Sequence, residues 1–165
     1  MMEAATEQNE LVVTRVIDAP REAVWKAWTE PEQVRKWWGP KGFTAPTIEG
    51  ELKVGGRYLY CMRSPEGRDY WSTGTYKEIV EPERIVATDS FADEKGNPVP
   101  ASYYGMPEAD EMPMETTIEV SFEELEEGKT RLTIKHVGMP AGTTSDMAGQ
   151  GWNESLDKLA AALAS

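Results

Sequence analysis

The sequence predicts a single α+β domain in which an antiparallel sheet of seven strands curls around a long C-terminal helix. Stretches that alternate apolar and polar residues fill most of the region between residues 43 and 137. Short turns rich in Gly and Pro separate these stretches, and turns of this kind join antiparallel neighbours into hairpins. The final stretch of the chain instead spaces its leucines for one face of a helix.

A strand and two short helices are expected to open the domain. Residues 11–17 are mostly β-branched and predict a strand, and Pro20 then suits the first turn of a helix. A second helix is expected to start at a capping box formed by Thr29 and Glu32 and to end at residues 39–40, a Gly-Pro pair. The apolar faces of the two helices predict core packing for Val24, Trp25, Trp28, Val34, Trp37 and Trp38.

Six further strands are expected over residues 47–54, 57–63, 70–79, 85–91, 115–123 and 131–137. Residues 92–113 form a long loop, and loops of this length in compact domains usually have a function or are mobile.

The last element is a helix that starts at Ser145 or Asp146 and presents Trp152, Leu156, Leu159 and Leu163 on one face. Gly149 and Gly151 each cost about 1 kcal/mol in such a helix, so we expect it to approach a strand or a ligand closely there.

Composition argues against several classes of protein. The net charge of −12 disfavours binding to nucleic acids and to anionic membranes. Cys61 and His136 are the only cysteine and the only histidine, which is too few for a zinc site, and no dinucleotide or phosphate-binding motif is present, so we expect no metal and no cofactor. Cys61 is expected to be a packed thiol.

The ends of the chain predict a soluble location. Residues 1–9 are expected to be a flexible tail, which leaves residues 10–165 as one domain. No segment has the pattern of a secretory signal or the length of a membrane span, so we expect a cytoplasmic protein. A monomer and a homodimer are both compatible with the sequence.

Several segments resemble one protein family. They are residues 18–25 (DAPREAVW), 37–44 (WWGPKGFT), 55–58 (GGRY), 74–79 (GTYKEI) and 151–152 (GW) with the leucines that follow. Together they resemble the stand-alone homologues of the heat-shock-protein-90 ATPase activator, within the START-like helix-grip superfamily. The resemblance covers about residues 10–164 and implies a helix-grip fold, a cavity for apolar molecules and a stress-response setting. The extra N-terminal domain of the eukaryotic activator has no counterpart here, so a chaperone partner is not expected.

Strand alternation predicts which side chains face the helix, because successive residues of a strand point to opposite faces of the sheet. Together with the resemblance it predicts a ligand-binding set of Tyr58, Tyr60, Met62, Tyr76, Ile118, Val120, Ile134, His136 and Trp152. The principal hypothesis is therefore a protein that binds a small apolar molecule, and whether it also catalyses a reaction is left open.

Two alternatives stay open. His136 could act as a general base in an enzyme of cyclase or hydrolase type, with a pocket tyrosine, because the ordinary pKa of histidine is about 6.5. No nucleophile motif accompanies it. The second alternative is an interaction module that acts on a chaperone or another protein through its acidic surface and the loop 92–113.

Overall fold

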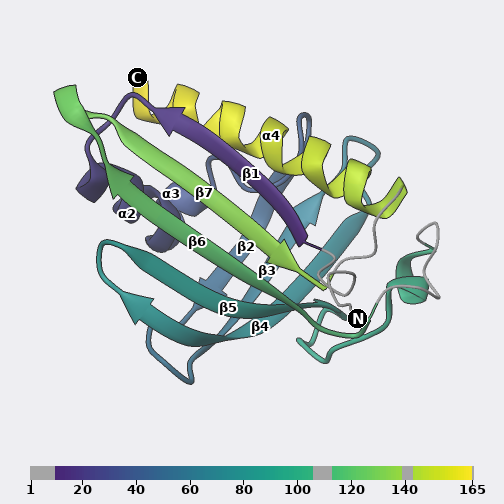
Figure 1. Ribbon diagram of the computed structural model, residues 1–165. Coiled ribbons are helices and arrows are strands. Elements are labelled where there is room, and N and C mark those ends of the chain that lie inside the picture. Colours follow the sequence, from purple (N-terminus) through teal and green to yellow (C-terminus); the bar gives the residue numbers. More distant parts are fainter. Residues whose placement is uncertain (1–9, 106–112, 139–142, 165) are drawn as a thin grey trace, which may run out of the picture.

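The computed structural model describes residues 10–105, 113–138 and 143–164, with the side chains of 143–145 left out, and it confirms the predicted fold class (Figure 1). The predicted tail, residues 1–9, and part of the predicted loop lie outside the described residues. The elements in chain order are β1 (Glu10–Ile17), α2 (Arg21–Thr29), α3 (Pro31–Val34), β2 (Thr44–Gly50), β3 (Arg57–Arg63), β4 (Asp69–Val80), β5 (Arg84–Ala92), η1 (Ala101–Tyr104), β6 (Thr116–Glu124), η3 (Glu126–Gly128), β7 (Thr130–Val137) and α4 (Thr143–Ala164).

The strands form one seven-stranded antiparallel sheet in the order β1-β7-β6-β5-β4-β3-β2. Strands β2 to β7 follow one another as hairpin neighbours, and β1 closes the sheet beside β7. Figure 1 shows α4 running along the sheet next to β1, with β2 and β3 lying behind the front strands. The sheet therefore curls around one side of the long helix.

Three local predictions were wrong. The second helix, α3, ends at Val34 and not at residues 39–40. The Thr29 side chain does not cap α3, because Thr29 is still part of α2 and its hydroxyl donates to the Trp25 carbonyl at 2.8 Å, a back-bond that a helical threonine favours. Strand β2 starts at Thr44 and not at residue 47, since a bulge between Thr44 and Thr47 interrupts the alternation. It ends at Gly50 because residues 51–56 form a tight turn closed by the Gly56 amide and the Lys53 carbonyl.

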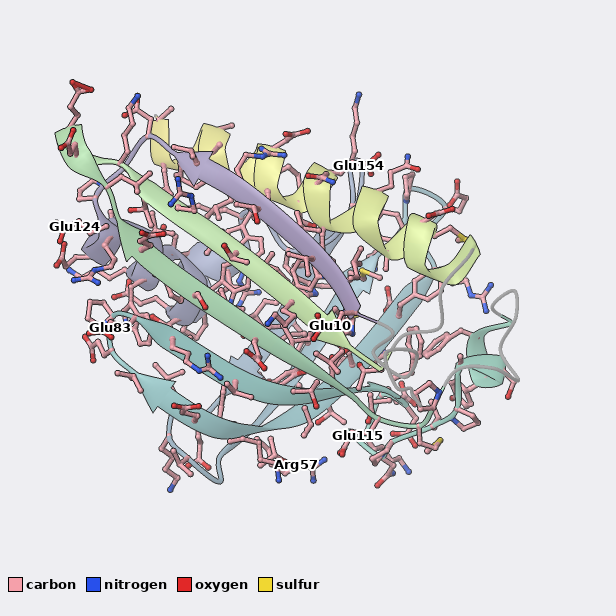
Figure 2. The ribbon with its side chains drawn as sticks, viewed as in Figure 1. Glu10, Arg57, Glu83, Glu115, Glu124 and Glu154 are labelled. Carbon is pink, nitrogen blue, oxygen red and sulfur yellow. The ribbon has the colours of Figure 1, made fainter. Side chains whose placement is uncertain are left out.

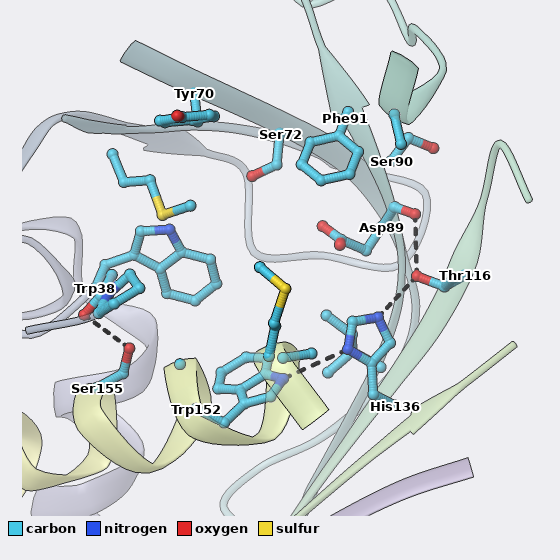
Figure 3. Close-up of a pocket in the computed structure, with 18 of the residues that line it drawn as sticks. Trp38, Tyr70, Ser72, Asp89, Ser90, Phe91, Thr116, His136, Trp152 and Ser155 are labelled. Atoms are coloured by element: carbon cyan, nitrogen blue, oxygen red, sulfur yellow. Dashed lines mark hydrogen bonds between the residues drawn. The ribbon is translucent and has the colours of Figure 1, made fainter. Parts of the chain in front are cut away.

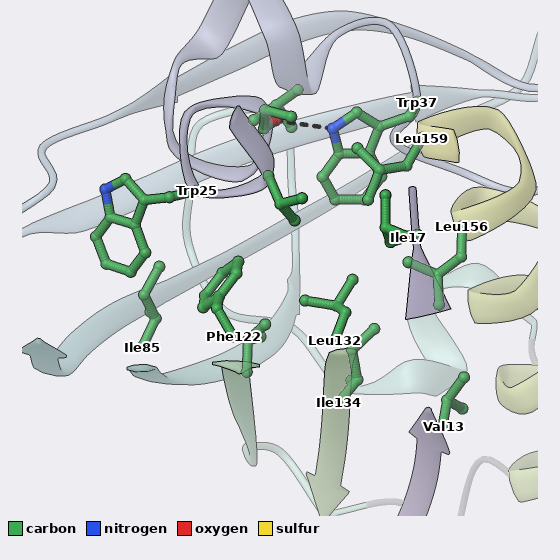
Figure 4. Close-up of a cluster of buried hydrophobic side chains, with 14 of the residues drawn as sticks. Val13, Ile17, Trp25, Trp37, Ile85, Phe122, Leu132, Ile134, Leu156 and Leu159 are labelled. Carbon is green, nitrogen blue, oxygen red and sulfur yellow. Dashed lines mark hydrogen bonds between the residues drawn. The ribbon is translucent and has the colours of Figure 1, made fainter. Parts of the chain in front are cut away.

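A dense apolar core seals one end of the space between sheet and helices (Figure 4). Leu156 and Leu159 of α4 are fully buried, and Trp37 is 1% exposed with its indole N–H donating to the Ala27 carbonyl at 2.9 Å. The Trp25 ring meets Phe122 of β6 edge-on, with 5.2 Å between centroids. Each fully buried side chain of this size contributes about 1.5–3 kcal/mol, so this end of the molecule holds α4 in place.

The segment between Trp38 and Thr44 ties α4 to the rest of the fold through backbone atoms. Ser155 donates to the Gly39 carbonyl at 2.8 Å, and the Lys158 ammonium donates to the carbonyls of Pro40 and Phe43, both at 3.2 Å. The Lys41 amide donates to Glu154 at 3.0 Å. These bonds fix the distance between the helix and the segment that precedes β2.

Gly74 allows one side chain to cross from β3 to β5. Tyr58 is paired with Gly74 in the β3–β4 ladder, and its hydroxyl reaches beyond β4 to the Thr88 carbonyl of β5 at 2.8 Å. A methyl group at Gly74 would collide with the Thr88 carbonyl oxygen and would lie 2.7 Å from Cε2 of the Tyr58 ring. The absence of a side chain at residue 74 is therefore what makes room for Tyr58.

We predict that Gly74→Ala lowers the free energy of unfolding by about 2–3 kcal/mol, because overpacking against backbone atoms cannot be relieved by a rotamer change. Urea unfolding measures this. Gly151→Ala is the control: its new methyl group would meet Pro40 at an ordinary 3.6 Å, so the helix should gain up to about 1 kcal/mol. Equal stability of Gly74→Ala and the natural protein would contradict the packing described.

Candidate ligand-binding site

A cavity of about 430 Å³ lies between the first half of α4, the inner face of the sheet and the segment after α3 (Figure 3). Its lining is mainly aromatic and aliphatic. The lining residues are Trp38, Gly39, Pro40 and Phe43 before β2; Met62 of β3; Tyr70, Trp71 and Ser72 of β4; Asp89, Ser90 and Phe91 of β5; Ala101, Pro113 and Met114; Thr116 and Ile118 of β6; His136 of β7; and Met147, Ala148, Gly151, Trp152 and Ser155 of α4.

The cavity exists because the two halves of α4 differ. The second half presents large buried leucines to the core, whereas two of the four described lining residues that the first half contributes, Ala148 and Gly151, are small; the other two are Met147 and Trp152. Gly149 faces a strand instead, and a methyl group there would lie 3.4 Å from Cδ1 of Leu11. A methyl group at Gly151 would likewise lie at an ordinary 3.6 Å from Pro40, so neither glycine is required by a close approach to a strand, and the expected close approach to a ligand stays a prediction.

His136 is held by a chain of hydrogen bonds in which each ring nitrogen has a partner (Figure 3). The Trp152 indole N–H donates to Nδ1 at 3.4 Å, and because indole only donates, the ring proton resides on Nε2. Nε2 then donates to the Thr116 hydroxyl at 2.8 Å, and that hydroxyl donates to the Asp89 carbonyl at 3.3 Å. Burial lowers the pKa of His136 to about 4, so the ring is neutral at pH 7.

Asp89 brings the one carboxylate among the described lining residues into the cavity. Its Oδ1 accepts from the Tyr58 hydroxyl at 2.8 Å. Burial raises the pKa of this carboxyl to about 6, an effect that the hydrogen bond from Tyr58 partly opposes. No lysine or arginine is present among the described residues that line the cavity.

A second, much smaller cavity of about 50 Å³ lies beside the first one, and volumes of this size hold at most one or two waters. Tyr58, Tyr60 and Tyr76 line it, with centroids 4.9 and 5.7 Å apart for the pairs that include Tyr58. Burial raises the pKa of all three phenols, so they are neutral.

The structure divides the predicted ligand-binding residues into three groups. Met62, Ile118, His136 and Trp152 line the large cavity. Tyr58, Tyr60, Tyr76 and Val120 line only the small one. Ile134 lines neither, because it is fully buried in the sealed core. Strand alternation indicates the face of the sheet, but it does not indicate where along a strand the helix moves away from it.

Asp89 was not among the predicted site residues, although a signal for it exists in the sequence. It follows Ile85 and Ala87 at intervals of two in β5, and both of these are buried on the inner face. An acidic residue that continues such an alternation points inward. Trp38, predicted as a core residue, was also missed: it packs against the core and lines the cavity as well.

Other chemistry has little support among the described residues. No group of three or more His, Cys, Asp or Glu side chains there could hold a metal ion. Cys61 is a buried thiol, and burial raises its pKa to about 11.

None of the described helices has the length and apolarity that crossing a membrane requires. Exposed acids such as Glu83 and Glu124 lie on the outside of the fold (Figure 2).

Comparison with known proteins gives a consistent picture. Residues 18–164 match the family described as Activator of Hsp90 ATPase homolog 1-like protein. A Chromobacterium violaceum protein of known crystal structure is 29% identical in sequence to this chain. The two structures superpose with a TM-score of 0.76, and the match covers 94% of this chain and 96% of that one. A solution structure from Arthrobacter aurescens is 26% identical, with a TM-score of 0.76 over 99% and 90% of the two chains. No curated protein matches the sequence.

We predict that Asp89→Asn stabilises the protein in a pH-dependent way. A carboxyl whose pKa is raised by folding makes its full contribution to the stability of the folded protein below about pH 4. That contribution is lost as the pH rises to about 6, the pKa in the folded state. The unfolding free energy of the variant, relative to the natural protein, should therefore increase by about 2–3 kcal/mol between pH 4 and pH 7. Urea unfolding at several pH values measures it.

Asp93→Asn provides a control of opposite sign. Hydrogen bonds from Asn97 and Lys95 lower the pKa of this exposed carboxyl, so its stabilising effect is present at pH 7 and disappears as the pH falls. The Asp93 variant should lose stability at pH 7 and recover it in acid. A pH-independent effect of Asp89→Asn would show that the carboxyl is not desolvated.

Proposed function

This chain belongs to the family of Activator of Hsp90 ATPase homolog 1-like proteins, and within that family we propose that it binds a small apolar molecule between the sheet and α4. The observation that carries the proposal is the cavity of about 430 Å³. Protein interiors pack as densely as organic crystals and leave few voids larger than a water molecule. Binding pockets for small ligands occupy about 300–1,000 Å³ and combine apolar walls with a few polar groups.

The make-up of the walls supports an apolar ligand with at least one ring. The rings of Trp38, Tyr70, Trp71, Phe91 and Trp152 surround the cavity on several sides, and such surfaces favour stacked or edge-on aromatic contacts. Met62, Met114 and Met147 add side chains that adapt to the shape of a guest. The polar groups are few and lie mainly on β4 and β5.

The enzymatic alternative has less support than ligand binding. A general base needs a free lone pair in reach of the substrate, whereas Nδ1 of His136 accepts from Trp152 and Nε2 is bonded to Thr116. The pKa of about 4 also makes this ring a weak base at pH 7. We therefore assign His136 the role of a neutral wall residue that positions the Trp152 indole.

We predict that Ala148→Phe weakens the binding of Nile red, a neutral apolar dye, by at least about tenfold, because the new ring occupies the cavity that the dye needs. Ala148 lies on the cavity face of α4. Dye fluorescence, which increases in an apolar environment, measures the affinity.

Gln150→Phe is the matched control, since it puts the same ring on the exposed face of the same helix turn. It should leave the affinity for Nile red unchanged. Equal affinities of the natural protein and the Ala148 variant, with both proteins folded, would contradict binding in this cavity.

A further inference from the structure

The Asp89 side chain is partly buried at the cavity wall, and its carboxylate receives one hydrogen bond from the described residues. An ionised carboxylate has about four acceptor sites, and buried ones are usually paired or multiply hydrogen-bonded. Within the described structure, the Tyr58 hydroxyl is the one donor to the Asp89 side chain, and it reaches Oδ1. Figure 3 shows the carboxylate directed into the cavity, between the rings of Phe91 and Trp152.

The Tyr58 hydroxyl cannot fully satisfy the carboxylate. It has a single hydrogen but lies 2.8 Å from two acceptors, Oδ1 of Asp89 and the Thr88 carbonyl. When that hydrogen is directed to Thr88, an ionised Asp89 retains no protein donor. A donor supplied from the cavity side removes this conflict.

The Ser72 and Ser90 hydroxyls also line the cavity, but neither donates to Asp89 in the described structure. Three other polar groups of the lining are already engaged. The Thr116 hydroxyl and the His136 Nε2–H are used in the chain that ends at the Asp89 backbone carbonyl. Ser155 donates to Gly39 on the far wall. The cavity thus has an acidic end at Asp89 and no cationic lining residue, within the part of the chain that the structure describes.

We propose that the ligand of this cavity is an apolar molecule with a protonated amine, and that the free oxygen of Asp89 binds the amine. The inference rests on the proposed function and adds the chemical class of the ligand. An ammonium brings both the missing donors and a compensating charge, and bonds to charged groups are about twice as strong as neutral ones. The aromatic walls add favourable cation–π contacts.

The same geometry disfavours fatty acids and other carboxylates. A second carboxylate beside Asp89 would put two negative charges in a site of low dielectric, where like charges repel strongly. The net charge of −12 acts in the same direction, because the field of an acidic protein attracts cations and repels anions during encounter.

The preference for an amine should depend on pH with a defined sign. Binding needs ionised Asp89, whose pKa is about 6, so the preference should decrease as the pH falls through that value. The other titratable groups near this end are Tyr58 on β3, which bonds to Asp89, and Tyr70 on β4 and His136 on β7, which line the cavity. Strand β6 and helix α4 contribute none to the described lining. Burial raises the pKa of Tyr58, and that of His136 is about 4, so neither of these two changes charge between pH 5 and 8.

The test is the displacement of Nile red by three matched compounds, naphthylmethylamine, naphthylmethanol and naphthylacetate, which share one ring system. At pH 7.5 the amine should displace the dye at about tenfold or more lower concentration than the alcohol, and the carboxylate should be the weakest. At pH 5 the advantage of the amine over the alcohol should shrink. In Asp89→Asn, with each affinity measured relative to that variant's own affinity for Nile red, the advantage of the amine over the alcohol should be lost.

Each result has a distinct meaning. If the dye binds and the three compounds compete equally, or the carboxylate is strongest, the assignment of an amine is overturned while the cavity stays a binding site. If Asp89→Asn keeps the amine preference, Asp89 is not the group that binds the amine. If Nile red does not bind the natural protein at all, the proposed function fails and this inference fails with it. A thermal melt of each variant shows whether it is folded.

Discussion

The packing of the second half of α4 against the sheet is the interaction on which the rest of the structure depends. It buries Leu156 and Leu159 completely at the sealed end, beside Trp37. Ser155 and Lys158 also hydrogen-bond to carbonyls of residues 39–43. Because the helix is rigid, these contacts fix the distance between its first half and the sheet. Two small residues of that half, Ala148 and Gly151, form part of the cavity wall, so the same contact that stabilises the fold leaves the cavity open.

The acidic end of the cavity depends on a second constraint, which spans three strands. Gly74 on β4 leaves space for Tyr58 of β3 to reach β5, and the Tyr58 hydroxyl then lies against Asp89. One missing side chain thus determines the place of an aromatic ring, and the ring determines the surroundings of a carboxyl. Burial raises the pKa of that carboxyl and makes its charge sensitive to what enters the cavity. A structural glycine and a binding group are in this way parts of one arrangement.

Much of the fold follows from local patterns, and less of the site does. The alternation in β3, β6 and β7 and the helical spacing of Trp152, Leu156 and Leu159 predicted the sheet and α4. The bulge near Pro46 shifted β2, because a bulge breaks the period of two that the prediction uses. Ile134 and His136 have the same parity on β7, yet one is sealed in the core and the other lines the cavity. That difference depends on where α4 moves away from the sheet, which no single strand encodes.

The most direct test of the cavity is an NMR titration with Nile red that follows the indole N–H signals of the tryptophans. Trp38, Trp71 and Trp152 line the large cavity, whereas Trp25 and Trp37 are buried in the sealed core. Binding in the cavity predicts large shifts for the first three signals and small ones for the other two. Shifts spread evenly over all of these signals, or no shift at saturating dye, would contradict the account.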